Sequence, residues 1–228
     1  MSRLQNNKRY LIALTNPRSP ITESYRALRT NIDFSSVDEQ TKVIMVTSAG
    51  PEEGKSTVVG NLAVTYAQNE RNVLLIDADM RKPTVHRTFQ LSNRYGLSSY
   101  LSRQADLEEV VQESEVPNLF VMTAGPIPPN PAEMLNSNSM TKLMEQLREQ
   151  FDIILIDTPP ILAVTDAQLL ASKSDGVLMV ISAGKVKKEV AIKAKDSLTR
   201  VNARILGVVL NNVKRKASEE YYYYYYGN

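Results

Sequence analysis

The sequence predicts an α/β fold in which a mostly parallel β-sheet is sandwiched between helices in three layers. Two observations carry this prediction. Short apolar runs of strand length alternate along the chain with longer segments of helical period, which is the pattern of parallel strands joined by crossover helices. The runs consist almost entirely of Val, Ile and Leu, as expected for strands that helices cover on both faces of the sheet.

A helix is expected first in the chain, over about 20–38. Its evidence is the recurrence of Ile21, Tyr25, Leu28 and Ile32 at helical spacing, which gives the segment one apolar face. The strands that follow are expected at 42–47, 72–77, 118–123, 152–157, 176–182 and 204–210. Helices are expected between them, near 55–69, 106–114, 139–150, 165–173 and 187–201.

The organisation into domains follows from what separates these elements. No internal repeat and no long Gly/Ser linker interrupts them, so residues 1–213 are expected to form a single domain. Residues 214–228 have no apolar periodicity and contain a run of consecutive tyrosines, and we expect a disordered tail there. The Pro-rich segment 125–135 is expected to be a loop that shapes the rim of the site.

Composition and charge exclude several classes of protein. The chain is 43% hydrophobic and 23% charged, values typical of globular domains rather than of disordered or fibrous chains. It has no cysteine, which excludes disulfides and thiolate metal sites and favours a reducing, cytoplasmic compartment. No signal peptide or membrane-spanning segment is recognisable, and a net charge of +2 is too balanced to indicate a nucleic-acid partner.

The segment AGPEEGKST lies between the first expected strand of the sheet and a helix. It matches the phosphate-binding pattern G-x-x-x-x-G-K-[ST], except that Ala49 replaces the first glycine. In such a P-loop, backbone N–H groups surround phosphate oxygens, Lys55 reaches the outer phosphates, and Ser56 ligates Mg²⁺. The alternative is an ordinary strand-to-helix turn, which this context disfavours. The predicted nucleotide-binding residues are Gly50, Pro51, Glu52, Glu53, Gly54, Lys55, Ser56 and Thr57.

Carboxylates follow two other strands at the edge where open α/β sheets bind ligands. Asp157 closes the run IILID in the Walker-B position, where a carboxylate holds Mg²⁺. Asp77 and Asp79, in LLIDADMR, are two residues apart and point to the same side of an extended chain. The alternative role for each aspartate is to cap a helix or turn. Arg81, Lys82 and Pro83, which follow them, are expected to face either the phosphates or an activator protein.

The sequence gives weaker evidence on which nucleotide base is bound. No guanine-specific Asn-Lys-x-Asp pattern is present, which favours ATP. Asn211, at the end of the last expected strand, is placed either to hydrogen-bond adenine or to cap a turn.

These blocks, in this order, resemble the deviant-Walker P-loop ATPases, which include MinD and ParA. Asp77-x-Asp79-x-Arg81 resembles the additional Walker-A′ motif of the bacterial tyrosine kinases (BY-kinases). Glu23-x-x-Arg26-x-x-Arg29 and the tyrosine-rich C-terminus are similar to that branch too. The closest form is the CapB/EpsB type, cytoplasmic kinases of capsule and exopolysaccharide biosynthesis whose activator is a separate membrane protein.

The resemblance implies a role for each residue of the site. Lys55 neutralises charge on the transferred phosphoryl group of ATP, and Mg²⁺ is held by Ser56, Asp79 and Asp157. Asp77 acts as the base toward the incoming tyrosine. Because an ordinary aspartate has a pKa of about 4 and a phenol one of about 10, Asp77 should orient the hydroxyl and accept its proton late.

The resemblance also implies how copies of the chain meet. From spacing alone, Glu23, Arg26 and Arg29 are a solvated helix face with one weak ion pair. In BY-kinases the matching motif builds a ring, in which each tail reaches a neighbour's site. The acceptors expected here are Tyr221, Tyr222, Tyr223, Tyr224, Tyr225 and Tyr226.

Further partners are implied in the same way. They are a membrane-bound activator of the polysaccharide chain-length-regulator type, protein tyrosine substrates and a phosphotyrosine phosphatase, with no nucleic acid. The chain would then lie at the inner face of the cell membrane through its activator.

Two other functions remain open from the sequence. One is a MinD/ParA-like ATPase switch without tyrosine kinase activity. It is disfavoured because Gly50 stands where those proteins carry a second lysine, and because the chain ends in tyrosines rather than in an amphipathic helix. The other is a noncatalytic, nucleotide-dependent scaffold in polysaccharide export.

Overall fold

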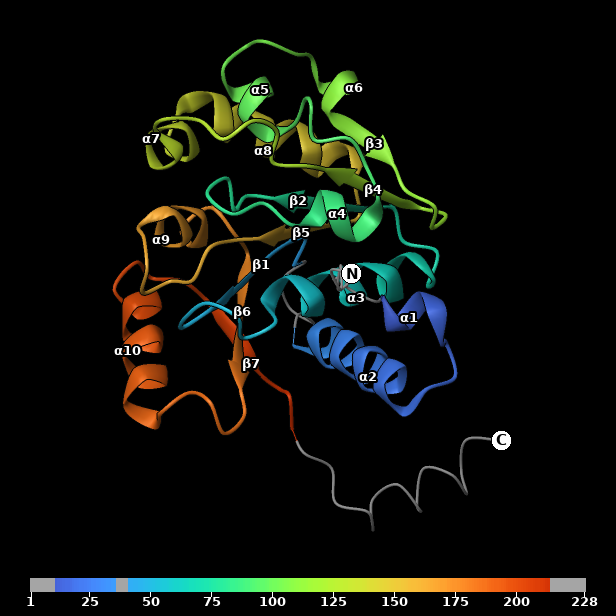
Figure 1. Ribbon diagram of the computed structural model, residues 1–228, viewed down its shortest axis with the longest axis vertical. Coiled ribbons are helices and arrows are strands. Elements are labelled where there is room, and N and C mark those ends of the chain that lie inside the picture. The colour runs from blue at the N-terminus through green and yellow to red at the C-terminus, as the bar shows by residue number, and fades with distance from the viewer. Residues whose placement is uncertain (1–10, 36–40, 214–228) are drawn as a thin grey trace, which may run out of the picture.

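The computed structural model describes residues 11–35 and 41–213, and within them the centre of the molecule is a seven-stranded sheet. The strand order is β3-β4-β2-β5-β1-β6-β7 (Figure 1). All neighbouring strands are parallel except β3 and β4. The strands are β1 (Val43–Ser48), β2 (Val73–Asp77), β3 (Val111–Glu113), β4 (Leu119–Met122), β5 (Ile153–Asp157), β6 (Gly176–Ser182) and β7 (Ile205–Asn211).

Helices cover both faces of this sheet, which confirms the predicted α/β class (Figure 1). One apolar cluster joins the sheet to α1–α4, and a second joins its other face to α5–α10. Every residue of β1, β2, β5 and β6 is buried, as their continuous apolar runs indicate. The helices are α1 (Ile12–Thr15), α2 (Pro20–Phe34), α3 (Lys55–Ala67), α4 (Val85–Phe89), α5 (Leu97–Leu101), α6 (Leu107–Val110), α7 (Pro131–Leu135), α8 (Asn138–Gln150), α9 (Asp166–Ala171) and α10 (Lys188–Thr199).

The leading helix differs from its prediction in length and in its buried face. It ends at Phe34 rather than near 38. Ile32 is buried and the two residues before it on the predicted stripe pack on the core, but Ile21 is 47% exposed. Thr22 is buried in its place, because its hydroxyl donates 2.8 Å to the carbonyl of Asn16 in the turn after α1. The helix begins with Ser19, whose side chain accepts from the Thr22 N–H.

The segment 106–114 is not the single helix that was expected. Helix α6 ends at Val110, and the chain continues directly as β3, antiparallel to β4. A helix of one turn has little stability of its own, so pairing with a neighbouring strand decides the conformation of the rest.

The sheet order brings the predicted site together. Strands β2, β5 and β1 are adjacent, so their carboxyl ends lie side by side, with Asp77 in register with Asp157. The expected tail 214–228 and its tyrosines lie outside the described residues. No helix in the described ranges combines the length and the hydropathy that crossing a bilayer requires.

Candidate active site

The predicted P-loop connects β1 to α3 and has an unusual backbone. Glu52 and Gly54 have φ angles of 59° and 91°, in the left-handed region. The φ of Gly54 favours glycine, and a Cβ there would lie 2.0 Å from the Asn211 amide nitrogen and so displace the Asn211 side chain. No side chain of the described residues caps the first turn of α3, so this helix N-terminus faces the loop as an anion site would require.

Lys55 points to the carboxylates at the ends of the neighbouring strands. Its Nζ lies 3.2 Å from Asp79 Oδ2, 3.4 Å from Asp157 Oδ1 and 3.3 Å from Ser56 Oγ. Burial alone would lower the pKa of Lys55, but the charges of Asp157 and Asp79 outweigh it and raise the pKa above its usual value. The side chain is therefore a permanent ammonium, only 13% exposed.

Ser56, Asp79 and Asp157, the predicted metal shell, thus converge on one positive charge. Asp157 is fully buried, and its Oδ2 has no hydrogen-bond partner among the residues described. Burial raises the pKa of Asp157 despite the opposing effects of Lys55 and the Ser56 hydroxyl, so a lysine shared with Asp79 does not fully compensate this carboxylate. An added cation would relieve that cost.

The same oxygen atoms fit a magnesium ion, which prefers carboxylate, hydroxyl and phosphate oxygens. Within 11–35 and 41–213, no three His, Cys, Asp or Glu side chains are grouped to hold a metal. The expected group of three strand-end carboxylates is therefore not a metal site by itself. An ion would need the Ser56 hydroxyl and the phosphates of a nucleotide as further ligands.

Asp77 is fully buried beside this cluster and braces the loop that follows it. Its Oδ2 accepts hydrogen bonds from the N–H groups of Thr84 and Val85, each at 2.9 Å, and its Oδ1 accepts one from Asp79 at 3.2 Å. Burial, with the nearby charge of Asp157, raises the pKa of Asp77 to about 7. The ordinary pKa of about 4, assumed from the sequence, is therefore too low, and Asp77 suits proton transfer near neutral pH better than expected.

A pH dependence of stability follows for the protein without nucleotide or divalent ions. Asp77 has a pKa of about 4 in the unfolded chain and about 7 in the folded one, so between these values the folded state holds a proton that the unfolded state has released. The free energy of unfolding should fall as pH rises through this window, at up to about 1.4 kcal/mol per pH unit. Urea titrations from pH 5 to 8 measure it. In Asp77→Asn the slope should flatten, and an unchanged slope would contradict the assignment to Asp77.

Arg81 has a partner that the sequence did not indicate. Its guanidinium donates to both carboxylate oxygens of Asp166, at 2.9 and 3.0 Å. Asp166 is buried and is the first residue of α9. The pair ties the loop after Asp77 to the segment after Asp157, so the expectation that Arg81 faces phosphates or a partner is replaced by an internal, positioning contact.

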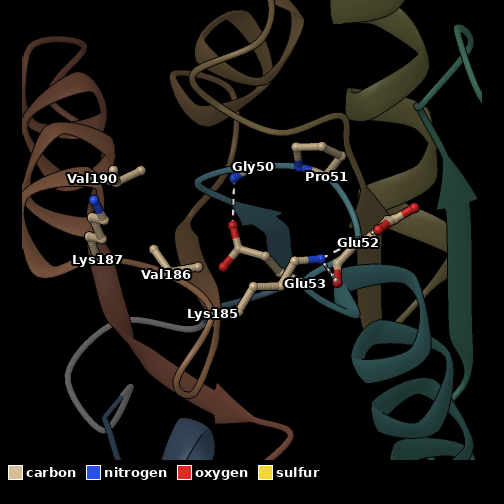
Figure 2. A pocket seen from close by; sticks show the side chains of 8 residues that line it. All are labelled: Gly50, Pro51, Glu52, Glu53, Lys185, Val186, Lys187 and Val190. Atoms are coloured by element: carbon tan, nitrogen blue, oxygen red, sulfur yellow. Dashed lines mark hydrogen bonds and ion pairs between the residues drawn. The ribbon is translucent and has the colours of Figure 1, made fainter.

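A pocket of about 390 Å³ opens on the other flank of the P-loop (Figure 2). It is bounded by the loop on one side and by the β6–α10 connection on the other. Asn211 is not among the lining residues; its amide donates 2.9 Å to the carbonyl of Glu53 and lies against the loop. The lining residues are Gly50, Pro51, Glu52, Glu53, Lys185, Val186, Lys187 and Val190.

The charged residues of α2 do not form one uniform stripe. Glu23 and Arg26 make an exposed ion pair at 3.0 Å. Arg29 instead donates 2.7 Å to the carbonyl of Thr65, in the last turn of α3. It is therefore engaged inside the chain, where a cation also favours the C-terminal end of a helix dipole.

Comparison with known proteins agrees with this geometry. The family model of an AAA domain matches residues 41–201. The chain is 51% identical over 213 residues to the tyrosine-protein kinase YwqD of Bacillus subtilis (strain 168), covering 93% of this chain and 89% of that one. It is 43% identical over 197 residues to the putative tyrosine-protein kinase CapB of Staphylococcus aureus, covering 86% of each.

Solved structures give the same result. The chimerical protein CapA2B2 is similar with a TM-score of 0.88 and 40% identity, covering 90% of each chain. The kinase domain of Escherichia coli tyrosine kinase ETK has a TM-score of 0.88 and 34% identity, over 95% of this chain and 86% of that one. MinD from Pyrococcus horikoshii OT3, at 22% identity over 78% of this chain and 72% of that one, has a TM-score of 0.67 and shares the fold. The chain belongs to the bacterial tyrosine-protein kinases.

Proposed function

We propose that the chain transfers the terminal phosphoryl group of ATP to tyrosine, and that the acceptors are Tyr221–Tyr226 of another copy. One observation carries this proposal: a P-loop lysine meets two strand-end carboxylates, Asp79 and Asp157, directly beside Asp77. This arrangement offers a phosphate cradle, ligands for a divalent ion and a proton acceptor at one edge of the sheet.

In the proposed reaction, each residue has a separate task. The P-loop N–H groups and Lys55 bind the phosphates, and Ser56, Asp79 and Asp157 hold Mg²⁺, which when bound neutralises phosphate charge. The bond between the terminal phosphorus and its bridging oxygen breaks as the bond to the tyrosine oxygen forms. Asp77 orients the phenol and receives its proton. The pKa of about 7 supports this role, because it lies close to neutral pH.

The proposal extends to partners and place. A membrane-bound activator of the polysaccharide chain-length-regulator type would hold the chain at the inner face of the membrane, where it would regulate capsule or exopolysaccharide synthesis. The similarity to CapA2B2, whose name joins a CapA and a CapB part, supports a partner of the CapA type. Other protein tyrosines as substrates and an opposing phosphotyrosine phosphatase complete the proposed cycle.

Mapping of phosphotyrosine tests this function. The full chain is mixed with ATP, Mg²⁺ and a cytoplasmic activator fragment, beside a chain that ends at Val213. Label on Tyr221–Tyr226 of the full chain supports the proposal. ATP hydrolysis without such label would instead favour the MinD-like switch.

Oligomerisation is tested separately by exchanging two charges on α2. The double variant Glu23→Arg, Arg26→Glu keeps an ion pair within the helix, at the same spacing as the present one, but inverts the charges offered to a neighbour. Arg29 stays unchanged because it contacts α3. We expect a folded monomer by light scattering, with a melting temperature only slightly lowered because Glu23→Arg places a cation in the first turn of α2. An oligomer of the original size would contradict the proposed ring contact.

A further inference from the structure

Glu53 is a charged residue buried within the P-loop itself. It is only 2% exposed. One oxygen of its carboxylate, Oε1, accepts a hydrogen bond from the Gly50 N–H, a bond that Figure 2 shows closing the loop on itself. The other oxygen, Oε2, accepts from the N–H of Ser182, the last residue of β6, at 3.1 Å. A single carboxylate therefore joins the start of the loop to a neighbouring strand.

The main chain of Glu53 is held as well. Its carbonyl accepts from the Asn211 amide at 2.9 Å, and Asn211 ends β7. The P-loop is thus fastened to two strands at once, through the side chain and through the carbonyl of the same residue. Ser182 and Asn211 lie 129 and 158 residues from Glu53 in the sequence.

These contacts surround a strained stretch of backbone. Glu52 has a φ of 59°, which a residue with a side chain adopts at a cost of on the order of 1 kcal/mol. Its own side chain is 86% exposed and makes only a 3.4 Å contact with Lys185, so it does little to fix this conformation. Such strain persists only where neighbouring contacts enforce it. The carbonyl of Glu52 accepts a long, 3.4 Å contact from Lys185 Nζ, and the bonds of Glu53 hold the next residue of the loop.

Removing the charge of Glu53 tests its role, because two possible roles predict opposite changes in nucleotide affinity. A carboxylate beside a phosphate site repels the ligand, so by Coulomb's law alone its removal should strengthen nucleotide binding. As a brace, however, it keeps the loop's N–H groups in place before the phosphates arrive, and its removal should weaken binding. The two effects predict opposite results.

We propose that Glu53 is a positioning residue of the nucleotide site, which fixes the P-loop by joining the Gly50 and Ser182 N–H groups. This inference rests on the proposed function only in requiring that the loop binds a nucleotide. Glutamine cannot replace Glu53, because an amide has one acceptor oxygen and would turn its NH₂ group toward an N–H donor. Aspartate is one methylene shorter and would reach only one of the two donors.

The experiment measures binding of fluorescent mant-ADP and of ATP to the full chain. We expect Glu53→Gln to raise both dissociation constants at least about tenfold, equivalent to about 1.4 kcal/mol. Glu53→Asp should also weaken binding. KM for ATP should rise more than kcat falls, whereas a general loss of structure would lower kcat and the ligand-free melting temperature together.

A matched control is Glu109→Gln, which removes the same charge outside the site, where the amide oxygen can still accept the one backbone N–H bond that Glu109 makes, from Asp106. It should leave both dissociation constants unchanged. Equal or tighter nucleotide binding by Glu53→Gln would overturn the inference, as would full affinity in Glu53→Asp. If the unmodified chain and all variants bind nucleotide as expected but none phosphorylates tyrosine, the proposed function is wrong and the positioning role of Glu53 is supported.

Discussion

Replacing Lys55 by methionine should lower the rate of tyrosine phosphorylation by about 10³-fold or more, the scale on which a single electrostatic contact to a transition state acts. Methionine keeps most of the length of the side chain, one heavy atom less than lysine, but removes its charge. The substitution also leaves Asp79 and Asp157 without the ammonium that lies 3.2 and 3.4 Å away. The nucleotide-free protein should therefore lose about 3 kcal/mol of stability at neutral pH, because a buried carboxylate is left unpaired.

Phosphotyrosine formation at saturating ATP and urea unfolding measure the two effects of Lys55→Met. Lys173→Met is a suitable control, since Lys173 makes an exposed contact with Thr141 away from the site. It should change neither quantity. Transfer at the normal rate by Lys55→Met would remove Lys55 from the mechanism.

Replacing Asp77 by asparagine should abolish most phosphoryl transfer, by about 10²- to 10⁴-fold, and leave ATP binding nearly intact. The amide oxygen can keep the two 2.9 Å bonds from the N–H groups of Thr84 and Val85, and only the longer, 3.2 Å bond from the Asp79 N–H is lost, because the NH₂ group cannot accept it. The loop is then largely retained, whereas the proton acceptor is lost.

Single-turnover transfer and nucleotide affinity, measured on the same preparation of Asp77→Asn, separate these two roles. Weak nucleotide binding together with slow transfer would show that Asp77 acts mainly by holding the loop after β2 rather than by accepting a proton. Normal transfer would exclude Asp77 as the base.

The local parts of the structure were predictable from the sequence. The runs that form β2 and β5 are apolar up to their final aspartates. The glycine-lysine-serine pattern lies between a strand and a helix, as a phosphate-binding loop requires. The class of fold and the placement of Asp77 and Asp157 at one edge followed from these features.

What the sequence left open were the partners of residues far apart in the chain. Arg81 and Asp166 are separated by 85 residues, and Arg29 and Thr65 by 36. Neither spacing carries a signal, because only the packing of complete helices and strands brings such groups together. The raised pKa of Asp77 was hidden for the same reason, since it arises from complete burial beside Asp157.

The position of Lys55 has a consequence for the order in which ligands arrive. Without nucleotide, the ammonium of Lys55 already contacts carboxylate oxygens that a divalent ion would use, although one positive charge does not balance two carboxylates. A triphosphate offers that ammonium other anionic oxygens and so frees the carboxylates. Nucleotide and divalent ion should therefore bind with positive cooperativity, and thermodynamic linkage makes the coupling equal in both directions. Either ligand alone would have to compete with the existing ion pairs between Lys55 and the two carboxylates.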